Sequence, residues 1–599
     1  MKSGNIKIYL SKFKQCVVFL YLFCMLGLFP LYHKDKYYQI GDAKFEFFWK
    51  VSLGFLGIFT VFALIRIIMQ TLTRGIDDTA TMGEKTKNNQ QQETNPLLRF
   101  LDNLSALDYG VFIYGICVIL SYAFSDYKEF ALKGAAGWNM GLCSQMIFVA
   151  LYFVLSRQRE FFQKLQDFKE KNEYQDLVKV ILSVHLGASA MAFLLGILHR
   201  FEIDPLGMYV GLDLYQKLEF LSTFGQATWF SGYVCTVFSV GVALFYVSQQ
   251  KWLRMLTGIY SVISFGILVT QNSDSAFMAI AGIMLLLGYF SLSDIKKWCR
   301  FWQVMSLMWG TFAGIGILQK IFADRVIPLD SLSVFFSQSA FTKAAFIGSL
   351  LLLLFYSNSY RKIIQKNQRI NTKKTIDIID SFEAQERAEE ADKLMLNTKR
   401  IYKGILFLVA AGVFFTIIFI YLNTKGYLLQ WFGYQNNNSY LLFDNHWGSN
   451  RGSTWMICWQ AFLEMPFYQK LFGVGPDSLS AYLYSIPEKS DLLYSLWGNL
   501  RLTNAHNEFL NSLLCYGIVG LAAWLAVLIR GIRYFYKKAK ENPFMIAFSL
   551  CIMGYACHNI FCYQQVCVTP FLFIAFGIGE AIFQSHVNHL LIDVGKTCK

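Results

Sequence analysis

Residues 505–510, Ala-His-Asn-Glu-Phe-Leu, continue to Tyr-Gly-Ile-Val-Gly at 516–520 and join a long polar segment to an apolar helix. These motifs place His506 at the predicted boundary between membrane and water, where a histidine can exchange protons near neutral pH. Asn504 is suited to cap the helix, which puts His506 in the first helical turn. The positive end of the helix dipole disfavours a charged imidazole there. We therefore expect a neutral histidine that can accept a proton; the alternative is a histidine that only hydrogen-bonds a loop.

The composition of the 599-residue chain is that of a membrane protein. Hydrophobic residues make up 55%, aromatic residues 17% and charged residues 16%, and the mean hydropathy is +0.38. Soluble domains carry about 25% charged residues. The formal charge of +14 could suggest nucleic-acid binding, but the basic residues lie mostly in short segments between apolar runs, as on the cytoplasmic side of a membrane. We predict an all-α integral membrane protein that contacts the lipid bilayer and no nucleic acid.

Apolar runs long enough to cross a bilayer recur along the whole chain. A helix needs about 20 such residues to cross, and by this criterion we predict about 14 transmembrane helices. The predicted spans lie at about 15–32, 48–69, 109–125, 140–156, 178–198, 231–248, 253–270, 276–293, 301–322, 341–357, 401–422, 506–529, 543–561 and 566–583.

The positions of lysine and arginine set the predicted orientation. They concentrate in short segments at 157–171, 251–254, 296–300 and 530–540, which we place in the cytoplasm because short basic loops stay there. Their alternation puts the N- and C-termini in the cytoplasm and the long loop 423–505 outside. We therefore predict a multi-pass protein of the plasma or inner membrane.

Three regions follow from this topology. Residues 1–400 form an N-terminal transmembrane bundle of about ten helices, with cytoplasmic loops near 70–108 and 358–400. Residues 401–585 form a second region that contains the outer loop, and 586–599 form a cytoplasmic tail. No small-residue cleavage pattern follows the first apolar run, so we expect this helix to be retained rather than removed as a signal peptide.

The outer loop 423–505 has predicted structure of its own. Ser453–Met465 carries tryptophans among small and polar residues, which indicates an amphipathic helix in the headgroup region. Pro466 ends this helix. Gly-Val-Gly-Pro-Asp at 473–477 predicts a sharp turn, and Ser478–Ser485 predicts a second short helix. We expect these helices to cap the outer mouth of the bundle.

Two arginines, Arg451 and Arg501, flank this cap. The planar guanidinium group is suited to binding phosphate oxygens through two parallel hydrogen bonds. A histidine base and two arginines at the outer membrane face therefore suit chemistry on an anionic lipid headgroup. The alternative for each arginine is an ion pair with a loop carboxylate, for instance that of Asp444, Asp477 or Asp491.

Other chemistries find little support in the sequence. There is no phosphate-binding loop, no dinucleotide-binding glycine motif and no zinc-protease motif. The 13 cysteines are scattered, and no spacing matches a metal site. We therefore predict no metal and no cofactor. Among the other histidines, His446 is the only rival base and ranks below His506, while His558 is expected to be a packed, hydrogen-bonded side chain.

Three blocks in the second region occur in a fixed order: Gly-Ser-Asn-Arg at 448–451 followed by Trp455, Phe-Gly-Val-Gly-Pro at 472–476, and the His506 motif with its Gly-Ile-Val-Gly at 517–520. In order, spacing and topology they resemble the O-antigen ligase/polymerase superfamily of polysaccharide membrane enzymes. The match in motifs covers about 448–520, and 401–585 would be the ligase-like region.

This resemblance implies a fold similar to the C-type, helical class of membrane glycosyltransferases. It implies an inverting, metal-independent transfer of a glycan from a polyprenyl diphosphate, such as undecaprenyl diphosphate, to a hydroxyl acceptor at the extracytoplasmic face. His506 would accept the proton of the acceptor hydroxyl. Arg451 and Arg501 would bind the diphosphate and stabilise the charge that grows on it.

Four further residues are candidates for positioning the substrates: Asn507, Asp274, Gly473 and Gly475. Asn507 would orient the histidine or a sugar. Many members of the superfamily carry a Ser-Arg pair in the outer turn that corresponds to Ser273-Asp274-Ser275, so this chain has an acid where an arginine is usual. Asp274 would instead pair with a loop arginine or contact the acceptor sugar.

Two function classes stay open at this point, besides a receptor or scaffold, for which no soluble partner module is visible in the sequence. The first is a membrane glycosyltransferase, either a ligase or a polymerase, whose acceptor is a glycan, a lipid or a protein hydroxyl. The second is a polysaccharide or lipid-linked-glycan transporter, since about 14 spans also suit a flippase. A transporter would distribute polar residues through several spans and show two related halves. This chain concentrates them in one outer loop, which favours the glycosyltransferase.

Overall fold

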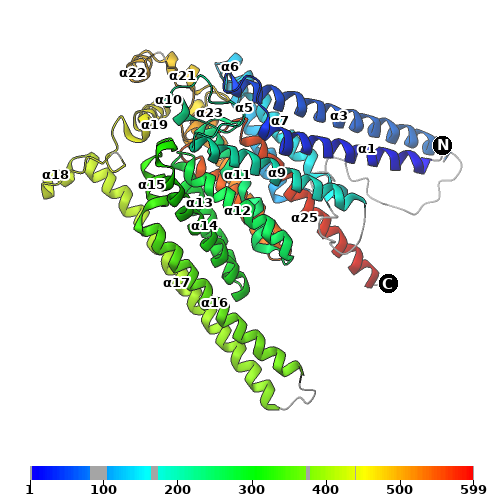
Figure 1. The fold of residues 1–599 in the computed structure, drawn as a ribbon. Coiled ribbons are helices and arrows are strands. Elements are labelled where there is room, and N and C mark those ends of the chain that lie inside the picture. Colours follow the sequence, from blue (N-terminus) through cyan, green and yellow to red (C-terminus); the bar gives the residue numbers. More distant parts are fainter. Residues whose placement is uncertain are drawn as a thin grey trace.

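The computed structural model describes residues 3–80, 104–162, 173–372, 378–438, 440–498 and 500–597. Most of the described chain is helical (Figure 1). The N-terminal part contains α1 (Ser3–Phe23), the π-helix Cys24–Leu28, α2 (Phe29–Leu31), α3 (Ile40–Ala80), α5 (Ala106–Phe124), α6 (Lys128–Lys133), α7 (Leu142–Ser156), α8 (Arg159–Phe162), α9 (Glu173–Arg200), α10 (Leu214–Glu219), α11 (Ala227–Val247), α12 (Lys251–Thr270), α13 (Ser275–Ser291), α14 (Ile295–Ile321), the 3-10 helix Ala323–Arg325, α15 (Ser331–Gln338) and α16 (Ala340–Thr372).

The second half continues with the helices of the segment 423–505, which is predicted to lie outside, and of the last predicted spans. They are α17 (Ile378–Thr424), α18 (Tyr427–Phe432), α19 (Trp447–Glu464), α20 (Phe467–Phe472), α21 (Leu479–Ser485), α22 (Pro487–Trp497), α23 (Glu508–Lys538), the 3-10 helix Pro543–Met545, α24 (Ile546–His558) and α25 (Thr569–Thr597). One small antiparallel hairpin joins β1 (Phe220–Leu221) to β2 (Gly225–Gln226), with Phe220 opposite Gln226.

Ten helices in the described residues are long and apolar enough to cross a membrane. Four shorter apolar helices, Leu142–Ser156, Ser275–Ser291, Pro543–His558 and Thr569–Phe583, lie where four further spans are predicted. The chain is therefore an integral membrane protein of the all-α class, as its composition predicts. The count of about 14 spans stays a prediction.

The helices form a bundle with one long hairpin beside it (Figure 1). In the bundle α11 packs against α12 and α24, and α23 packs against α5 and α24. Helices α16 and α17 extend away from the bundle as a long pair, and they cover most of the segment 358–400 that is predicted to lie in the cytoplasm. The sequence there is rich in glutamate, alanine and lysine, which favour helix, so the spans continue as helices. Most of the loop predicted near 70–108 lies outside the described residues.

The predicted outer segment folds into short helices at one end of the bundle, where α19, α21 and α22 are found (Figure 1). Ser485 of α21 contacts Tyr127, the residue before α6, through their hydroxyl groups at 2.8 Å. Helix α19 becomes regular at Arg451, after left-handed residues at Gly448, Ser449 and Asn450, and ends before Pro466. Helix α21 occupies the place of the predicted second helix. The sequence analysis did not identify the short helices α18, α20 and α22.

A break inside α23 fixes this outer segment to the bundle. Gly517 has φ 69° and ψ −174°, so the helix is interrupted there. The interruption leaves helix carbonyls available to other partners. The amide of Val474 donates to the carbonyl of Leu514 at 2.9 Å, and the amide of Gly475 donates to that of Cys515 at 3.0 Å. The glycine turn of the outer segment thereby docks on the broken helix.

Two glycines make this close approach possible. Gly473 has φ 77° and ψ −174°, and a Cβ on it would overlap the carbonyl group of Cys515. A Cβ on Gly517 would overlap the carbonyl group of Leu471. The two backbones therefore cross where neither residue can carry a side chain. This packing explains why the glycine turn and the Gly-Ile-Val-Gly motif occur together in the sequence.

We predict that Gly473→Ala lowers the melting temperature of the detergent-solubilised protein more than Gly498→Ala does. Gly498 also has a backbone unfavourable to a side chain, with φ 58° and ψ −127°, but a Cβ there meets no atom within 4 Å. Backbone strain alone costs about 1–3 kcal/mol, and Gly473→Ala adds the overlap with the Cys515 carbonyl. Equal melting temperatures for the two variants would contradict this packing.

Candidate functional site

His506 lies just before α23 and not within its first turn. The helix begins at Glu508, and Asn507 is its N-cap, with its side-chain oxygen accepting from the amide of Leu510 at 2.9 Å. His506 has φ 48°, a left-handed conformation, and its amide donates to the side chain of Asn504 at 3.0 Å. The prediction that Asn504 caps the helix is therefore wrong. A left-handed residue such as His506 cannot belong to a right-handed helix, so the cap is Asn507, three residues after the predicted one.

The imidazole of His506 packs against Tyr563, edge to face, with ring centroids 5.3 Å apart. In the described part of the chain its ring nitrogens make no hydrogen bond. Burial and, after it, the positive charge of Arg451 lower the pKa of His506 to about 4. The imidazole is therefore neutral at neutral pH. The sequence analysis predicts this state, but its cause is burial and an arginine instead of the helix dipole.

Arg451 is the cation of the site. Its Nη1 donates to the carbonyl of Gly448 at 2.7 Å, while its buried Nε has no hydrogen-bond partner among the described residues. Burial lowers the pKa of Arg451, and its interactions with Asp274 and Tyr563 partly oppose that decrease. Among the described residues no carboxylate lies within 4.0 Å of its guanidinium group, so the loop ion pair considered as an alternative is not formed. An unpaired, partly buried guanidinium can accept an anion.

Arg501 contacts residues other than His506 and Arg451. Its Nε donates to Ser480 Oγ at 3.0 Å. Its guanidinium carbon lies 4.9 Å from the ring centre of Tyr484 and 5.9 Å from that of Phe130. The residue is exposed, so these contacts hold it on the rim of the outer segment, where a ligand can still reach it.

Asp274 lies in the turn between α12 and α13 and accepts a hydrogen bond from Tyr440 Oη at 3.3 Å. No ion pair within 4.0 Å connects it to Arg451 or Arg501 in the described residues. The turn is held by Arg200, a fully buried residue whose guanidinium donates to the carbonyls of Thr270 at 2.9 Å and Gln271 at 3.2 Å. The sequence analysis missed this role of Arg200, because a buried arginine that binds only carbonyls has no partner residue in the sequence pattern.

The glycine turn places Asp477 instead of contacting His506 directly. A Cβ on Gly475 would overlap Ser125, so both predicted glycines, Gly473 and Gly475, serve close packing. Asp477 follows them, and its Oδ2 accepts from the amides of Ala135 at 2.8 Å and Met140 at 3.1 Å. These bonds fix the loop between α6 and α7 over the start of α23. Burial raises the pKa of Asp477 to about 7.

An aromatic cluster adjoins His506, and the sequence analysis missed it. The ring centroid of Trp138 lies 5.0 Å from that of Tyr563 and 5.3 Å from that of Trp229. Trp229 Nε1 donates to Tyr563 Oη at 3.3 Å. The three residues belong to the α6–α7 loop, to α11 and to the α24–α25 loop. Aromatic residues in predicted outer turns could have indicated a binding surface. The three residues are far apart in the sequence, however, so the sequence alone does not show that they are in contact.

Glu508 holds the loop that carries Tyr563. Its side chain is buried and accepts from Asn559 Nδ2, from Tyr555 Oη at 3.2 Å and from Gln564 Nε2 at 3.2 Å. Its amide donates to the carbonyl of Asn559 at 3.0 Å. A carboxylate held by several donors orders both segments. Glu508 therefore joins the start of α23 to the α24–α25 loop.

Two other histidines, His446 and His558, have ring nitrogens in hydrogen bonds. His446 is exposed, with its Nδ1 3.0 Å from Asn450 Oδ1. His558 is buried, with Nε2 3.1 Å from Ser231 Oγ and Nδ1 2.9 Å from Asn559 Oδ1. In the described residues no group of three or more His, Cys, Asp and Glu side chains could hold a metal ion.

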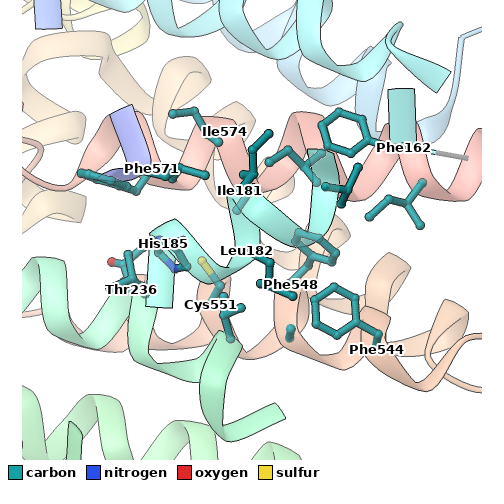
Figure 2. Close-up of a pocket in the computed structure, with 18 residues that line it drawn as sticks. Phe162, Ile181, Leu182, His185, Thr236, Phe544, Phe548, Cys551, Phe571 and Ile574 are labelled. Atoms are coloured by element: carbon teal, nitrogen blue, oxygen red, sulfur yellow. The ribbon is translucent and has the colours of Figure 1, made fainter. Parts of the chain in front are cut away.

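A separate apolar cavity of about 100 Å³ lies between α9, α11, α24 and α25 (Figure 2). Phe162, Ile181, Phe544, Phe548 and Ile574 are among its lining residues, and His185 and Thr236 are the polar ones. None of the predicted site residues lines it, so the cavity is distinct from the His506 cluster.

The comparison with known proteins identifies one family. Residues 326–525 match the O-antigen ligase family. No curated protein matches the chain. The matched segment runs from just before α15 to the middle of α23, so it contains Arg451, the glycine turn and His506. Residues 326–525 of the chain are therefore similar to the O-antigen ligase family, which supports the resemblance to the O-antigen ligase/polymerase superfamily that its motifs predict.

Proposed function

We propose that this protein transfers a glycan from a polyprenyl diphosphate to a hydroxyl acceptor at the extracytoplasmic face of the membrane, as a ligase or a polymerase. The observation that carries the proposal is the pair formed by Arg451 and His506. A guanidinium without a carboxylate partner lies within electrostatic reach of a neutral imidazole whose ring nitrogens make no hydrogen bond in the described chain. The two groups supply an anion site and a base.

The proposed reaction is a single inverting displacement that needs no metal. The acceptor oxygen attacks the anomeric carbon as His506 accepts the hydroxyl proton. The bond from that carbon to the diphosphate oxygen breaks, and the diphosphate leaves with the electron pair. Arg451 stabilises the charge that develops on the leaving group. A positioned general base typically contributes about 10²–10⁴-fold to such a rate.

The donor itself would strengthen the base. Without donor, the charge of Arg451 helps to keep the pKa of His506 low. A bound diphosphate would offset this charge, so the pKa of His506 would rise toward the operating pH, where a general base is most effective. The site would then hold a weak base when empty and a stronger base when the donor is present.

The remaining candidate residues have supporting roles in this proposal. Arg501 is exposed and would bind the outer phosphate or the glycan from the rim. Asp274, hydrogen-bonded to Tyr440, would contact the acceptor. Asn507 is occupied as the N-cap of α23, so it would orient His506 through the backbone.

We expect His506→Ala to reduce glycan transfer by about 10²–10⁴-fold while the donor still binds and accumulates. The measurement is transfer of polyprenyl-linked glycan in membranes that contain equal amounts of each protein. His446→Ala is the control and should keep transfer near the wild-type rate. Transfer by His506→Ala within a few-fold of wild type would refute the general-base role. The transporter alternative would be supported if the wild type transferred no glycan but moved it across the membrane, and if His506→Ala lost that movement.

We expect Arg451→Ala to raise the KM for the donor by about 10–100-fold, since a hydrogen bond to a charged group contributes about 1.5–3 kcal/mol. Arg451→Lys keeps the charge but loses the fork of donors, so it should recover part of the loss. Arg501→Ala should have the smaller effect because Arg501 lies on the rim. A larger loss for Arg501→Ala than for Arg451→Ala would assign the diphosphate to the rim.

The pH dependence gives a separate test. Because the pKa of His506 in the free protein is lowered to about 4, kcat/KM for the donor should fall only below about pH 5, instead of near the ordinary histidine pKa of about 6.5. The acid limb of kcat should lie at higher pH, because the bound diphosphate favours imidazolium. Arg451→Gln should move the limb of kcat/KM to higher pH. An acid limb near pH 6.5 that Arg451→Gln leaves unchanged would contradict this assignment.

A further inference from the structure

A small polar cavity of about 20 Å³ lies next to His506. Its lining includes Trp138, Asp477, Asn504, Asn511, Tyr563 and Gln564. Two of these residues also contact His506: Asn504 accepts from its amide, and Tyr563 packs against its imidazole. The cavity and the proposed base therefore share two walls.

Several polar groups around this cavity have hydrogen-bonding capacity left. Both hydrogen bonds that the described residues make to Asp477 fall on Oδ2, which leaves Oδ1 as an acceptor. The side-chain oxygen of Asn511 accepts from Ala505 at 3.2 Å, but its Nδ2 has only a long 3.8 Å contact with Cys515 Sγ. The indole N–H of Trp138 has no partner in the described chain. These three residues line the same cavity and together offer an acceptor and two donors, a combination that suits a hydroxyl group.

The charge and size of the cavity restrict what it can hold. No lysine or arginine lines it, so it offers a diphosphate no cation. A volume of about 20 Å³ accommodates about one water-sized group, not a sugar ring. Trp138 lies against Tyr563 and Trp229 beside this space, and flat aromatic surfaces of this kind pack against the apolar face of a pyranose.

We propose that this cavity binds a hydroxyl or hydroxymethyl substituent of a neutral acceptor sugar, whose ring packs on Trp138 while another of its hydroxyls reaches His506. The inference rests on the proposed function, and it names the acceptor as a glycan rather than a protein hydroxyl. Arg451 does not line this cavity, and neither does any other arginine or lysine, so the diphosphate and the neutral sugar would bind in separate places. The donor sugar shares this chemistry, and the test separates the two.

The test measures the kinetics of the full-length protein in proteoliposomes. The donor is the polyprenyl-linked glycan extracted from the source membranes, and the acceptor is the oligosaccharide released from it by mild acid. We expect Trp138→Ala to raise the KM for the oligosaccharide at least 10-fold and to leave the KM for the donor within about twofold. Trp138→Phe keeps an aromatic ring and should lie between. Trp459→Ala, at an exposed tryptophan of α19 that does not line the cavity, is the matched control.

The kinetic constants of the Trp138 variants either support or overturn the proposed acceptor site. An increase in the KM for the donor instead would assign the cavity to the donor sugar and overturn the proposal. Unchanged constants in Trp138→Ala and Trp138→Phe would also overturn it. If the wild type transfers no glycan, the proposed function fails, and quenching of tryptophan fluorescence by the same oligosaccharide still tests the cavity. Quenching in the wild type that Trp138→Phe removes supports the sugar site, and quenching equal in both refutes it.

Discussion

The site depends on the break of α23 at Gly517. A regular helix would use the carbonyls of Leu514 and Cys515 for its own hydrogen bonds, but the break leaves them to the amides of Val474 and Gly475. The side chain of Ser121 on α5 also donates to the Cys515 carbonyl at 2.6 Å. One interruption therefore joins the outer segment and α5 to backbone carbonyls of α23, whose directions are fixed. These contacts determine where the following side chains of each segment lie.

Two consequences of this junction meet at His506. On one side Asp477, placed by the glycine turn, fixes the α6–α7 loop and with it Trp138. On the other side Glu508 ties the start of α23 to the loop that carries Tyr563. His506 lies between these supports, and Arg451 approaches from the left-handed turn at the start of α19. The supports are buried polar contacts, so they can hold a reactive geometry at a boundary where loops would otherwise move.

Much of this arrangement could be predicted from the sequence, and the failures have identifiable causes. The apolar runs predict the helices because length and hydropathy decide whether a segment can cross a bilayer. The three motifs predict the family and the proximity of Arg451 to His506. The helix cap was misassigned because Asn504 and Asn507 are equally good caps by residue type, and only the left-handed backbone of His506 distinguishes them. The aromatic cluster and the role of Arg200 were missed because they depend on contacts between distant segments, which periodicity does not reveal.

The central claim is that a diphosphate binds at Arg451 beside His506. A cryo-electron microscopy map of the full-length protein in lipid nanodiscs with polyprenyl diphosphate tests it most directly. The account predicts density for two phosphates against the Arg451 guanidinium, with the imidazole of His506 adjacent and the polar cavity at Trp138 free of phosphate. Phosphate density at Arg501 alone, or in the cavity lined by Asp477, would contradict it.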